Sequence, residues 1–240
     1  HLAGLKAVGD SVNDPSSYYD NNISGAISLV KAMELSKVDN LIFSSSATVY
    51  GEPEYLPIDE AHRLDAQSPY GLTKKLVEEI FNNYCEQKSN KRVISLRYFN
   101  PVGAHPSGLI GERPSGIPNN LMPYIAQVAN EERSFLSVFG DLYPTKDGTG
   151  VRDYIHVVDL AEGHVAALNH IGSMKSSTDV FNLGTGEGYS VLDVVEQYEE
   201  ASGKTIPKKI VSARPGDVAE CYACTSKALE VLGWEAKRTL

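Results

Sequence analysis

The sequence predicts an α/β fold with a doubly wound parallel sheet and a second, smaller α/β domain. Over about the first hundred residues, short apolar runs alternate with amphipathic helical patterns, which is typical of parallel strands joined by crossover helices. The alternation stops at Gly103, where a long segment rich in Gly and Pro begins. A chain of 240 residues, 42% hydrophobic and 22% charged, can hold one large domain and a small companion. We therefore expect two domains, 1–101 and 102–240.

The first domain is expected to supply most of the main sheet. Asn13 or Asp14 can cap the first helix, and Pro69 stands just before the second, where a missing N–H costs nothing. A polar loop over 51–69 precedes this second helix. The expected elements are a strand end at 1–4, a loop through residue 9, a helix at 15–35, a strand at 41–43, a helix from 70 to about 81 and a strand at 93–98.

The second domain is expected to begin with a long loop and to contain shorter strands. Loops of such length in compact domains are usually functional. Ser190 can cap a helix that ends near Ser202, and the strand at 180–183 can return to the main sheet. The other expected elements are a helix at 119–129, strands at 137–139 and 151–155 that flank a hairpin at 143–148, a helix at 157–171, a strand at 208–211 and a helix from about 225.

Charge and composition exclude some classes of function. A formal net charge of -9 would repel a phosphate backbone, and no run of Lys or Arg offsets it, so no nucleic-acid partner is expected. The longest apolar stretches are interrupted by charge, so we expect no membrane-spanning helix. The three cysteines are too few for a disulfide framework. These features favour a cytoplasmic protein.

Tyr70 and Lys74 are the first candidate pair for catalysis. Residues four apart share one face of a helix, and a nearby cation can lower the pKa of a phenol so that it acts as a base. The spacing alone is more often a solvated helix face. The run of serines that ends at Ser46 changes the balance, because it follows a predicted parallel strand, where such sheets place ligands. A hydroxyl there can hold a substrate oxygen while the phenolate takes its proton.

Other motifs are weighed on their spacing. The glycines at 184–188 follow a strand, but no acidic residue ends a second strand some twenty residues on, which favours a tight turn over a dinucleotide fingerprint. Cys221 and Cys224 have the spacing of a metal or redox pair, yet further ligands are missing, so structural cysteines are favoured. Arg152 and Arg214 each suit the surface, and together they can clamp a diphosphate. The six histidines show no metal spacing, so no metal is expected.

Longer motifs carry a resemblance that covers essentially the whole chain. The sequence resembles the extended short-chain dehydrogenase/reductase superfamily and, within it, the UDP-glucose 4-epimerase family. The motifs are those at 44–51 (SSSATVYG), 68–74 (SPYGLTK), 1–9 (HLAGLKAVG), 18–22 (YYDNN), 97–108 (RYFNPVGAHPSG), 117–124 (IPNNLMPY) and 147–161 (DGTGVRDYIHVVDLA). The resemblance implies a Rossmann-type fold that binds NAD in the first domain and a UDP-sugar mainly in the second.

The resemblance also implies catalytic roles. Tyr70 would remove the proton from the 4-hydroxyl of the sugar, and Lys74 would lower the pKa of the phenol and bind the nicotinamide ribose. Ser46 would hydrogen-bond the 4-oxygen, with Ala47 and Thr48 beside the sugar. A 4-keto intermediate would turn over in the pocket and be reduced on its other face, so that UDP-galactose and UDP-glucose interconvert.

Binding residues follow from the same resemblance. NAD would contact the catalytic residues and a second group, which consists of Leu2, Ala3, Gly4, Leu5, Lys6, Asn21 and Phe99. The UDP-sugar would contact Lys6, Asn100, Asn120, Leu121, Ser137, Val138, Phe139, Arg152, Arg214, Asp217 and Cys221. The arginines would lie on the diphosphate, Asp217 on the ribose hydroxyls and residues 137–139 against the uracil. A small side chain at Cys221 leaves room for an N-acetyl group, so turnover of UDP-N-acetylglucosamine is expected as well.

The sequence departs from the family in one respect. The glycine-rich fingerprint that binds the adenosine half of NAD should precede His1, so we expect an internal fragment with an exposed sheet edge and weak NAD binding in isolation. Members of this family are usually homodimers through helices that flank the sheet. Two alternatives stay open, which are a nucleotide-sugar dehydratase or decarboxylase and a non-catalytic protein that binds nucleotide sugars.

Overall fold

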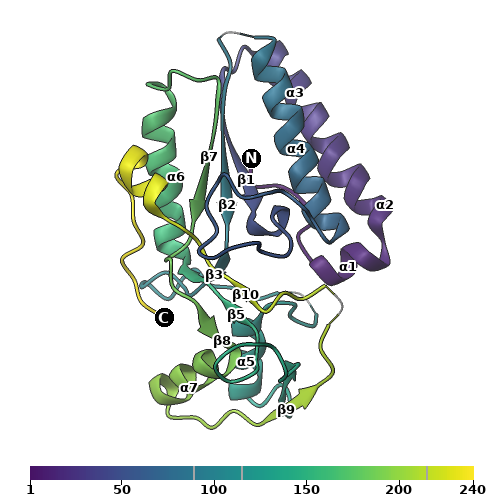
Figure 1. Cartoon of the computed structure of the whole chain (residues 1–240), viewed down its shortest axis with the longest axis vertical. Helices are drawn as coiled ribbons and strands as arrows, with labels where there is room; N and C mark the ends of the chain where they lie inside the picture. The colour runs from purple at the N-terminus through teal and green to yellow at the C-terminus, as the bar shows by residue number, and fades with distance from the viewer. Residues whose placement is uncertain (89, 115, 215) are drawn as a thin grey trace.

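Three parallel strands form the main sheet of the computed structural model, which describes residues 1–88, 90–114, 116–214 and 216–240. The order is β1 (Asn40–Ser46), β2 (Arg92–Tyr98) and β7 (Thr178–Leu183), with β2 in the centre. Figure 1 shows α3 (Gly25–Ser36) and α4 (Pro69–Glu86) on one side of this sheet and α6 (Val157–Ile171) on the other. Helices on both faces of a parallel sheet confirm the predicted α/β class.

Apolar side chains of the sheet fill the space on both of its faces. Phe43 and Val93 pack with Phe81 of α4, whereas Ile94 and Phe181 belong to the cluster under α6. Successive residues of a strand point to opposite faces, so the continuous apolar run that predicted β2 serves both layers.

Helix α4 brings the predicted catalytic pair to the sheet. Its cap is Ser68, whose Oγ accepts from the Gly71 N–H at 3.1 Å, and Pro69 occupies the first turn. Val77, Phe81 and Cys85 recur every four residues on the buried face. That face fixes the rotation of the helix, so that its first turns point at the carboxyl ends of β1 and β2.

The first helical region is more complex than the sequence predicts. The expected helix at 15–35 consists of α2 (Pro15–Tyr18), the π-helix η1 (Tyr19–Ser24) and α3. Asp14 caps it, accepting from the Ser17 N–H at 3.2 Å. The loop expected through Gly9 is wrong in part, because α1 (Val8–Asn13) begins there. This helix is only six residues long, too short for a periodic pattern to reveal.

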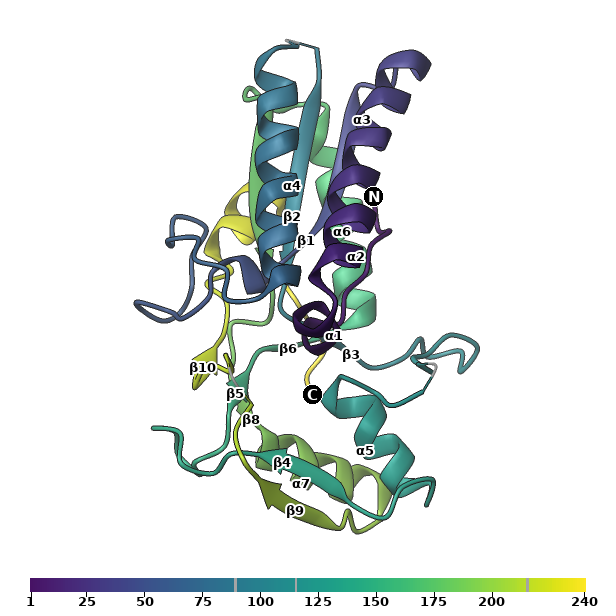
Figure 2. The same cartoon turned by 90° about the vertical axis from the view of Figure 1, so that its right-hand side faces the viewer.

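The second half of the chain forms most of the lower lobe, which Figure 2 shows from the side. Helices α5 (Leu121–Ala129) and α7 (Val191–Ser202) pack around a core that includes Ile125 and Val194. The strands are β3 (Asn100–Val102) with β6 (Tyr154–His156), β4 (Leu136–Phe139) with β9 (Lys208–Val211), and β5 (Val151–Arg152) between β8 (Tyr189–Ser190) and β10 (Glu220–Cys221). Short helical turns η2 (Ala47–Val49) and η3 (Ala228–Leu232) complete the elements described.

The hairpin predicted around 143–148 is wrong. The turn itself exists, since the Tyr143 N–H donates to the Gly148 carbonyl at 2.9 Å. However, β4 pairs in parallel with β9, and β5 pairs with β8 and β10. Strands of two to four residues carry too little sequence pattern to specify a partner, so their pairing depends on tertiary packing.

Candidate active site

Tyr70 and Lys74 lie together on the buried face of α4. Their residues are 9% and 7% exposed. The Lys74 Nζ lies 5.7 Å from the centroid of the Tyr70 ring and donates to the Ser44 carbonyl at 2.7 Å. The structure therefore brings the predicted phenol and ammonium to the serine run.

Ser46 and Thr48 stand at the end of β1, opposite the start of α4. The Ser46 Oγ accepts from both the N–H and the hydroxyl of Thr48, at 3.3 and 3.0 Å. Gly71 makes this approach possible, because a Cβ there would lie 2.7 Å from the Thr48 carbonyl oxygen. Absence of a side chain at Gly71 thus sets the distance between the helix and the turn.

Burial governs the protonation of the pair. It raises the pKa of Tyr70, and a hydrogen bond with Ser46 offsets part of this change. Burial also lowers the pKa of Lys74 to about 8, against the opposing charge of Glu78. The pKa of Tyr70 therefore shifts upward and not downward as the sequence predicts, because desolvation is the largest cause. A hydroxyl partner such as Ser46 favours the phenolate.

The segment 2–6, predicted to contact the cofactor, lies across α4. The Leu5 N–H donates to the Asn22 Oδ1 at 2.8 Å, and the Asn22 Nδ2 donates to the Leu5 carbonyl at 3.0 Å. A Cβ at Gly4 would lie 3.1 Å from Asn22 and 3.8 Å from the Lys74 Nζ. Absence of a side chain at Gly4 lets segment 2–6 lie close to Asn22 and Lys74, and its exposed backbone beside a cation suits a nucleotide such as NAD.

Asn22 is a residue that the sequence alone did not single out. It is 6% exposed and also donates to the Thr73 hydroxyl at 3.0 Å, which ties segment 2–6 to α4. Asn21, the predicted cofactor contact, is exposed on the same π-helix. The two asparagines are adjacent, so the sequence gives no signal that distinguishes Asn22, which holds segment 2–6, from Asn21, the predicted cofactor contact.

Phe99 and Asn100 follow β2 directly, at the junction of the two lobes. Phe99 is 6% exposed and packs in a cluster with Ala47. The Asn100 N–H donates to the Asp153 carbonyl at 2.9 Å, which begins the pairing of β3 with β6. Both predicted residues therefore lie at the carboxyl edge of the main sheet, with Ser46.

Arg152 and Arg214 converge on Asp217. The Arg214 Nε donates to the Asp217 Oδ2 at 2.8 Å, and the Arg152 Nη2 lies 3.9 Å from its Oδ1. The Arg214 guanidinium also stacks 4.7 Å above the ring of Phe139. Residues from β4, from β5 and from the segment before β10 thus meet, as a diphosphate clamp requires.

Lys6 and Asn120 are joined by Glu112, another residue that sequence reasoning missed. The Asn120 Nδ2 donates to the Glu112 Oε1 at 3.3 Å, and the Lys6 Nζ lies 3.6 Å from the same oxygen. Asn120 precedes α5 but makes no side-chain cap there. Of the other predicted nucleotide contacts, Leu121 lies on α5, and Ser137 and Val138 lie on β4.

Cys221 lies beside Arg152 in the register of β10 with β5. Burial raises the pKa of its thiol to about 11, so the group is neutral at physiological pH. Cys221 and Cys224 are both half-buried and free. Cys221 also packs against the cluster that contains Ala47, which places its small side chain near the predicted sugar contacts.

Asp153 holds the glycine-rich segment 184–188. Its carboxylate accepts from the N–H and hydroxyl of Thr185, both at 2.8 Å, and from the N–H groups of Gly186 and Ala223 at 3.0 and 3.1 Å. Gly186 has a φ of +84° in this segment between β7 and β8. The favoured prediction of a tight turn is confirmed.

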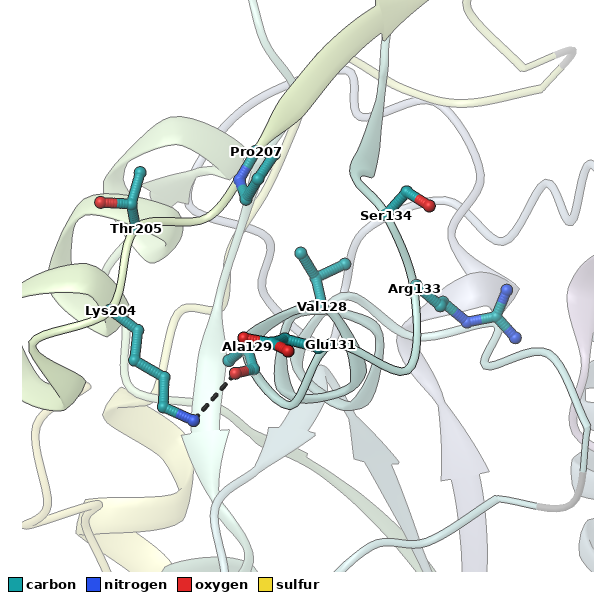
Figure 3. A pocket seen from close by; sticks show the side chains of 8 residues that line it. All are labelled: Val128, Ala129, Glu131, Arg133, Ser134, Lys204, Thr205 and Pro207. Carbon is teal, nitrogen blue, oxygen red and sulfur yellow. Dashed lines mark hydrogen bonds between the residues drawn. The ribbon is translucent and has the colours of Figure 1, made fainter.

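A surface depression of about 450 Å³ lies apart from these residues, at the end of α5 (Figure 3). The Lys204 Nζ donates there to the Ala129 carbonyl at 2.8 Å, which satisfies an acceptor at the helix end. None of the predicted site residues lines it.

The described helices include none that is long and apolar enough to cross a membrane. The described side chains include no cluster of three metal ligands.

Known proteins resemble this chain along its whole length. A profile of the family described as GDP-mannose 4,6 dehydratase matches residues 1–240. The UDP-glucose 4-epimerase of Bacillus subtilis is 58% identical over 100% of this chain and 70% of its own length. The human UDP-glucose 4-epimerase is 56% identical over 98% of this chain and 68% of its own length. The UDP-glucose 4-epimerase of Bifidobacterium longum, solved with NAD+ and UDP, superimposes with a TM-score of 0.95, at 54% identity, over 100% of this chain and 71% of that one.

Proposed function

This chain belongs to the UDP-glucose 4-epimerase family, within the extended short-chain dehydrogenases/reductases, and on that premise we propose how its residues interconvert UDP-galactose and UDP-glucose. The observation that carries the proposal is the convergence of Tyr70, Lys74 and Ser46 at one edge of the sheet. The alternative of a dehydratase or decarboxylase needs a further acid and base near Ala47, where the sequence has a plain Ser-Ala-Thr pattern.

Tyr70 and Ser46 are the groups that act on the sugar 4-hydroxyl. Ser46 holds the oxygen by a hydrogen bond, and Tyr70 takes its proton as a general base. Lys74 stabilises the phenolate, because its buried ammonium lies over the ring, 5.7 Å from the centroid. The proton returns from Tyr70 once the 4-keto sugar has presented its other face.

Bound NAD would supply the hydride acceptor and donor for the sugar C4, and the reaction would have no net redox change. Segment 2–6, Asn21 and Phe99 hold this cofactor in our proposal. Asn22 fixes the path of Leu5, and the absence of a Cβ at Gly4 lets the segment lie close to Asn22 and Lys74. Lys74 therefore serves the phenol and the nicotinamide ribose at once.

The nucleotide is held by the lower lobe. Arg152 and Arg214 bind the diphosphate with their guanidinium groups, and Asp217 turns to the ribose hydroxyls. The remaining nucleotide and sugar contacts are those predicted from the resemblance, at Lys6, Ala47, Thr48, Asn100, Asn120, Leu121, Ser137, Val138 and Phe139. Binding energy thus falls mainly on the UDP, which leaves the 4-keto sugar free to turn.

Cys221 widens the choice of substrate. Its thiol is small and neutral, and it adjoins the cluster that contains Ala47. An N-acetyl group on the sugar C2 has room beside such a side chain. We expect the holoenzyme to interconvert the N-acetylated UDP-hexosamines, and a protein that turns over only UDP-hexoses would contradict this.

Homodimer formation in the cytoplasm completes the proposal. Helix α3 exposes Ile27 and Leu35 on the outer layer, with exposures of 41% and 87%, where a second copy can cover them. The described cysteines are all free, as suits a reducing compartment. Light scattering of the purified holoenzyme tests this assembly, and a monomer at micromolar concentration would contradict it.

A Tyr70→Phe variant tests the catalytic role. Loss of a general base costs about 10²- to 10⁴-fold in kcat, so conversion of UDP-galactose by the holoenzyme should fall by that factor. Tyr55→Phe is the matched control, since Tyr55 is 46% exposed and its hydroxyl donates to Asp59, away from the catalytic residues. Equal turnover in the two variants would favour the non-catalytic alternative.

A further inference from the structure

A buried ion pair lies one turn below Lys74, between α4 and β2. Arg97 donates to the Glu78 carboxylate through Nε at 3.1 Å and through Nη2 at 2.6 Å, and the two side chains are 5% and 7% exposed. Such a pair adds little net stability, because removal of both charges from water offsets their attraction. Its place beneath the active site calls for a functional explanation.

Glu78 also receives the hydroxyl of Ser45, the neighbour of Ser46. This contact joins the end of β1 to α4, at the point where the two carry the substrate hydroxyl and the catalytic pair. Glu78 and Lys74 are four residues apart on one helix face. The Glu78 carboxylate therefore contacts the end of β1 and shares a helix face with Lys74.

Arg97 extends the network to two further segments. Its Nη1 donates to the Tyr50 hydroxyl at 3.0 Å, which donates in turn to the Asn182 Oδ1 at 2.6 Å. Tyr50 follows the turn that holds Thr48, and Asn182 lies on β7. A shift of any one member would leave a buried polar group without a partner, so the network is rigid.

Glu78 interacts with both cations of this region, because it pairs with Arg97 and opposes the effect of burial on Lys74. Without Glu78, the Arg97 guanidinium would be an unpaired buried cation on β2, opposite Ser45 and next to the Ser44 carbonyl that Lys74 contacts. The other groups that face this region are Tyr70 on α4, Tyr18 on α2, Tyr98 on β2 and the amino group of His1. Glu60 also lies beside Arg97, but its carboxylate accepts from the Asn182 N–H at 2.8 Å. Glu78 is the carboxylate that pairs with the Arg97 guanidinium.

We propose that Glu78 is a positioning residue for epimerisation, which fixes the ends of β1, α4 and β2 and neutralises Arg97 so that Lys74 remains a cation beside Tyr70. The proposal rests on the proposed function. It predicts that removal of the Glu78 charge affects the titration of Lys74, whereas a purely structural role would affect stability alone.

The test is a comparison of Glu78→Gln with Glu79→Gln, whose side chain is exposed on the same helix. NMR titration of lysines labelled at Cε reports the pKa of Lys74, and Lys74→Arg assigns its signal. We expect the pKa of Lys74 to fall by about one unit in Glu78→Gln and to stay unchanged in the control. The alkaline limb of the kcat profile should move by the same amount in the holoenzyme.

A double variant, Glu78→Gln/Arg97→Met, removes both charges and should recover at least half of the shift. Equal Lys74 titrations in the two glutamine variants would overturn the proposal, as would a double variant that shifts further than the single one. If Glu78→Gln does not fold, the double variant decides the test alone. A Lys74 pKa that recovers at least half of the expected shift supports the proposal, and a double variant that does not fold overturns it. If the wild-type holoenzyme is inactive, the proposed function is wrong, whereas the expected lysine titrations stay the same.

Discussion

Lys74 is a charge that the fold holds against its preference. Burial penalises the ammonium, and the only hydrogen bond that compensates it is the one to the Ser44 carbonyl among the contacts of the described residues. Active sites commonly retain such groups at the expense of stability, because chemistry needs the charge there. The residue should therefore separate activity from stability when it is replaced.

A Lys74→Met variant should abolish turnover and stabilise the protein at neutral pH by about 1–2 kcal/mol. The pKa of Lys74 is about 8 in the folded state, below its ordinary value of 10.5. The unfolded chain then binds more protons between these values, so wild-type stability rises with pH across this window. Urea unfolding at pH 7 and pH 10.5 should show the advantage of the variant shrinking, and a constant difference would contradict this.

Prediction from sequence succeeded at residues that belong to long motifs. Tyr70, Lys74 and Ser46 meet as expected, since a capped helix and a parallel strand fix their positions. It failed for Asn22 and Glu112, because their partners are distant in sequence and neither residue type predicts a tether.

Helix α4 and the turn η2 behave as one unit at the scale of elements. Gly71 is their contact point, where a Cβ would meet the Thr48 carbonyl oxygen at 2.7 Å and the Ala66 Cβ at 3.2 Å. The oxygen belongs to the backbone, so relief requires a shift of the helix or of the turn. Such a shift changes the distance between Tyr70 and Ser46.

A Gly71→Ala variant should lose stability by about 1–3 kcal/mol through overpacking and lose kcat at least tenfold. Gly25→Ala is the control, because a Cβ at Gly25 meets nothing within 4 Å. Alanine favours helix there, so the control should gain up to about 1 kcal/mol. Thermal unfolding and epimerase assays check both, and equal effects of the two variants would contradict the close approach as the cause.

Elements as long as α4 and β2 were predictable from the sequence, because their hydrophobic patterns extend over at least two helical turns or six strand residues. The pairing of β4 with β9 was not, since the four-residue strand β4 faces its partner across about seventy residues of chain. The predicted hairpin followed the local turn signals alone. Tertiary packing of α5 and α7 decides the outcome instead.

At the scale of the whole molecule, Arg152 lies next to a residue that connects the lower lobe to the main sheet. Arg152 lies on β5, one residue before Asp153, whose carboxylate holds the turn after β7. In the proposed clamp, a nucleotide on Arg152 would contact β5, directly before the residue that holds the turn after β7. Nucleotide binding should therefore stabilise the entire fold.

UDP at one hundred times its Kd should stabilise the protein by about 2.7 kcal/mol and raise its Tm accordingly. Arg152→Lys should weaken UDP binding about tenfold, because an ammonium cannot form the forked contact. Arg63→Lys is the control, since Arg63 pairs with the exposed side chains of Glu54 and Asp65. Calorimetric titration of UDP separates the outcomes, and equal affinities in both variants would exclude Arg152 from the clamp.

The parallel register of β1 and β2 also constrains how this protein can diverge. Ser46 is opposite Tyr98, so an insertion of one residue in either strand would turn every following side chain to the other layer. Length changes are therefore excluded inside the strands and better tolerated in exposed loops such as 105–111. The strands that carry the catalytic groups can vary by substitution, whereas variation in length is confined to such loops.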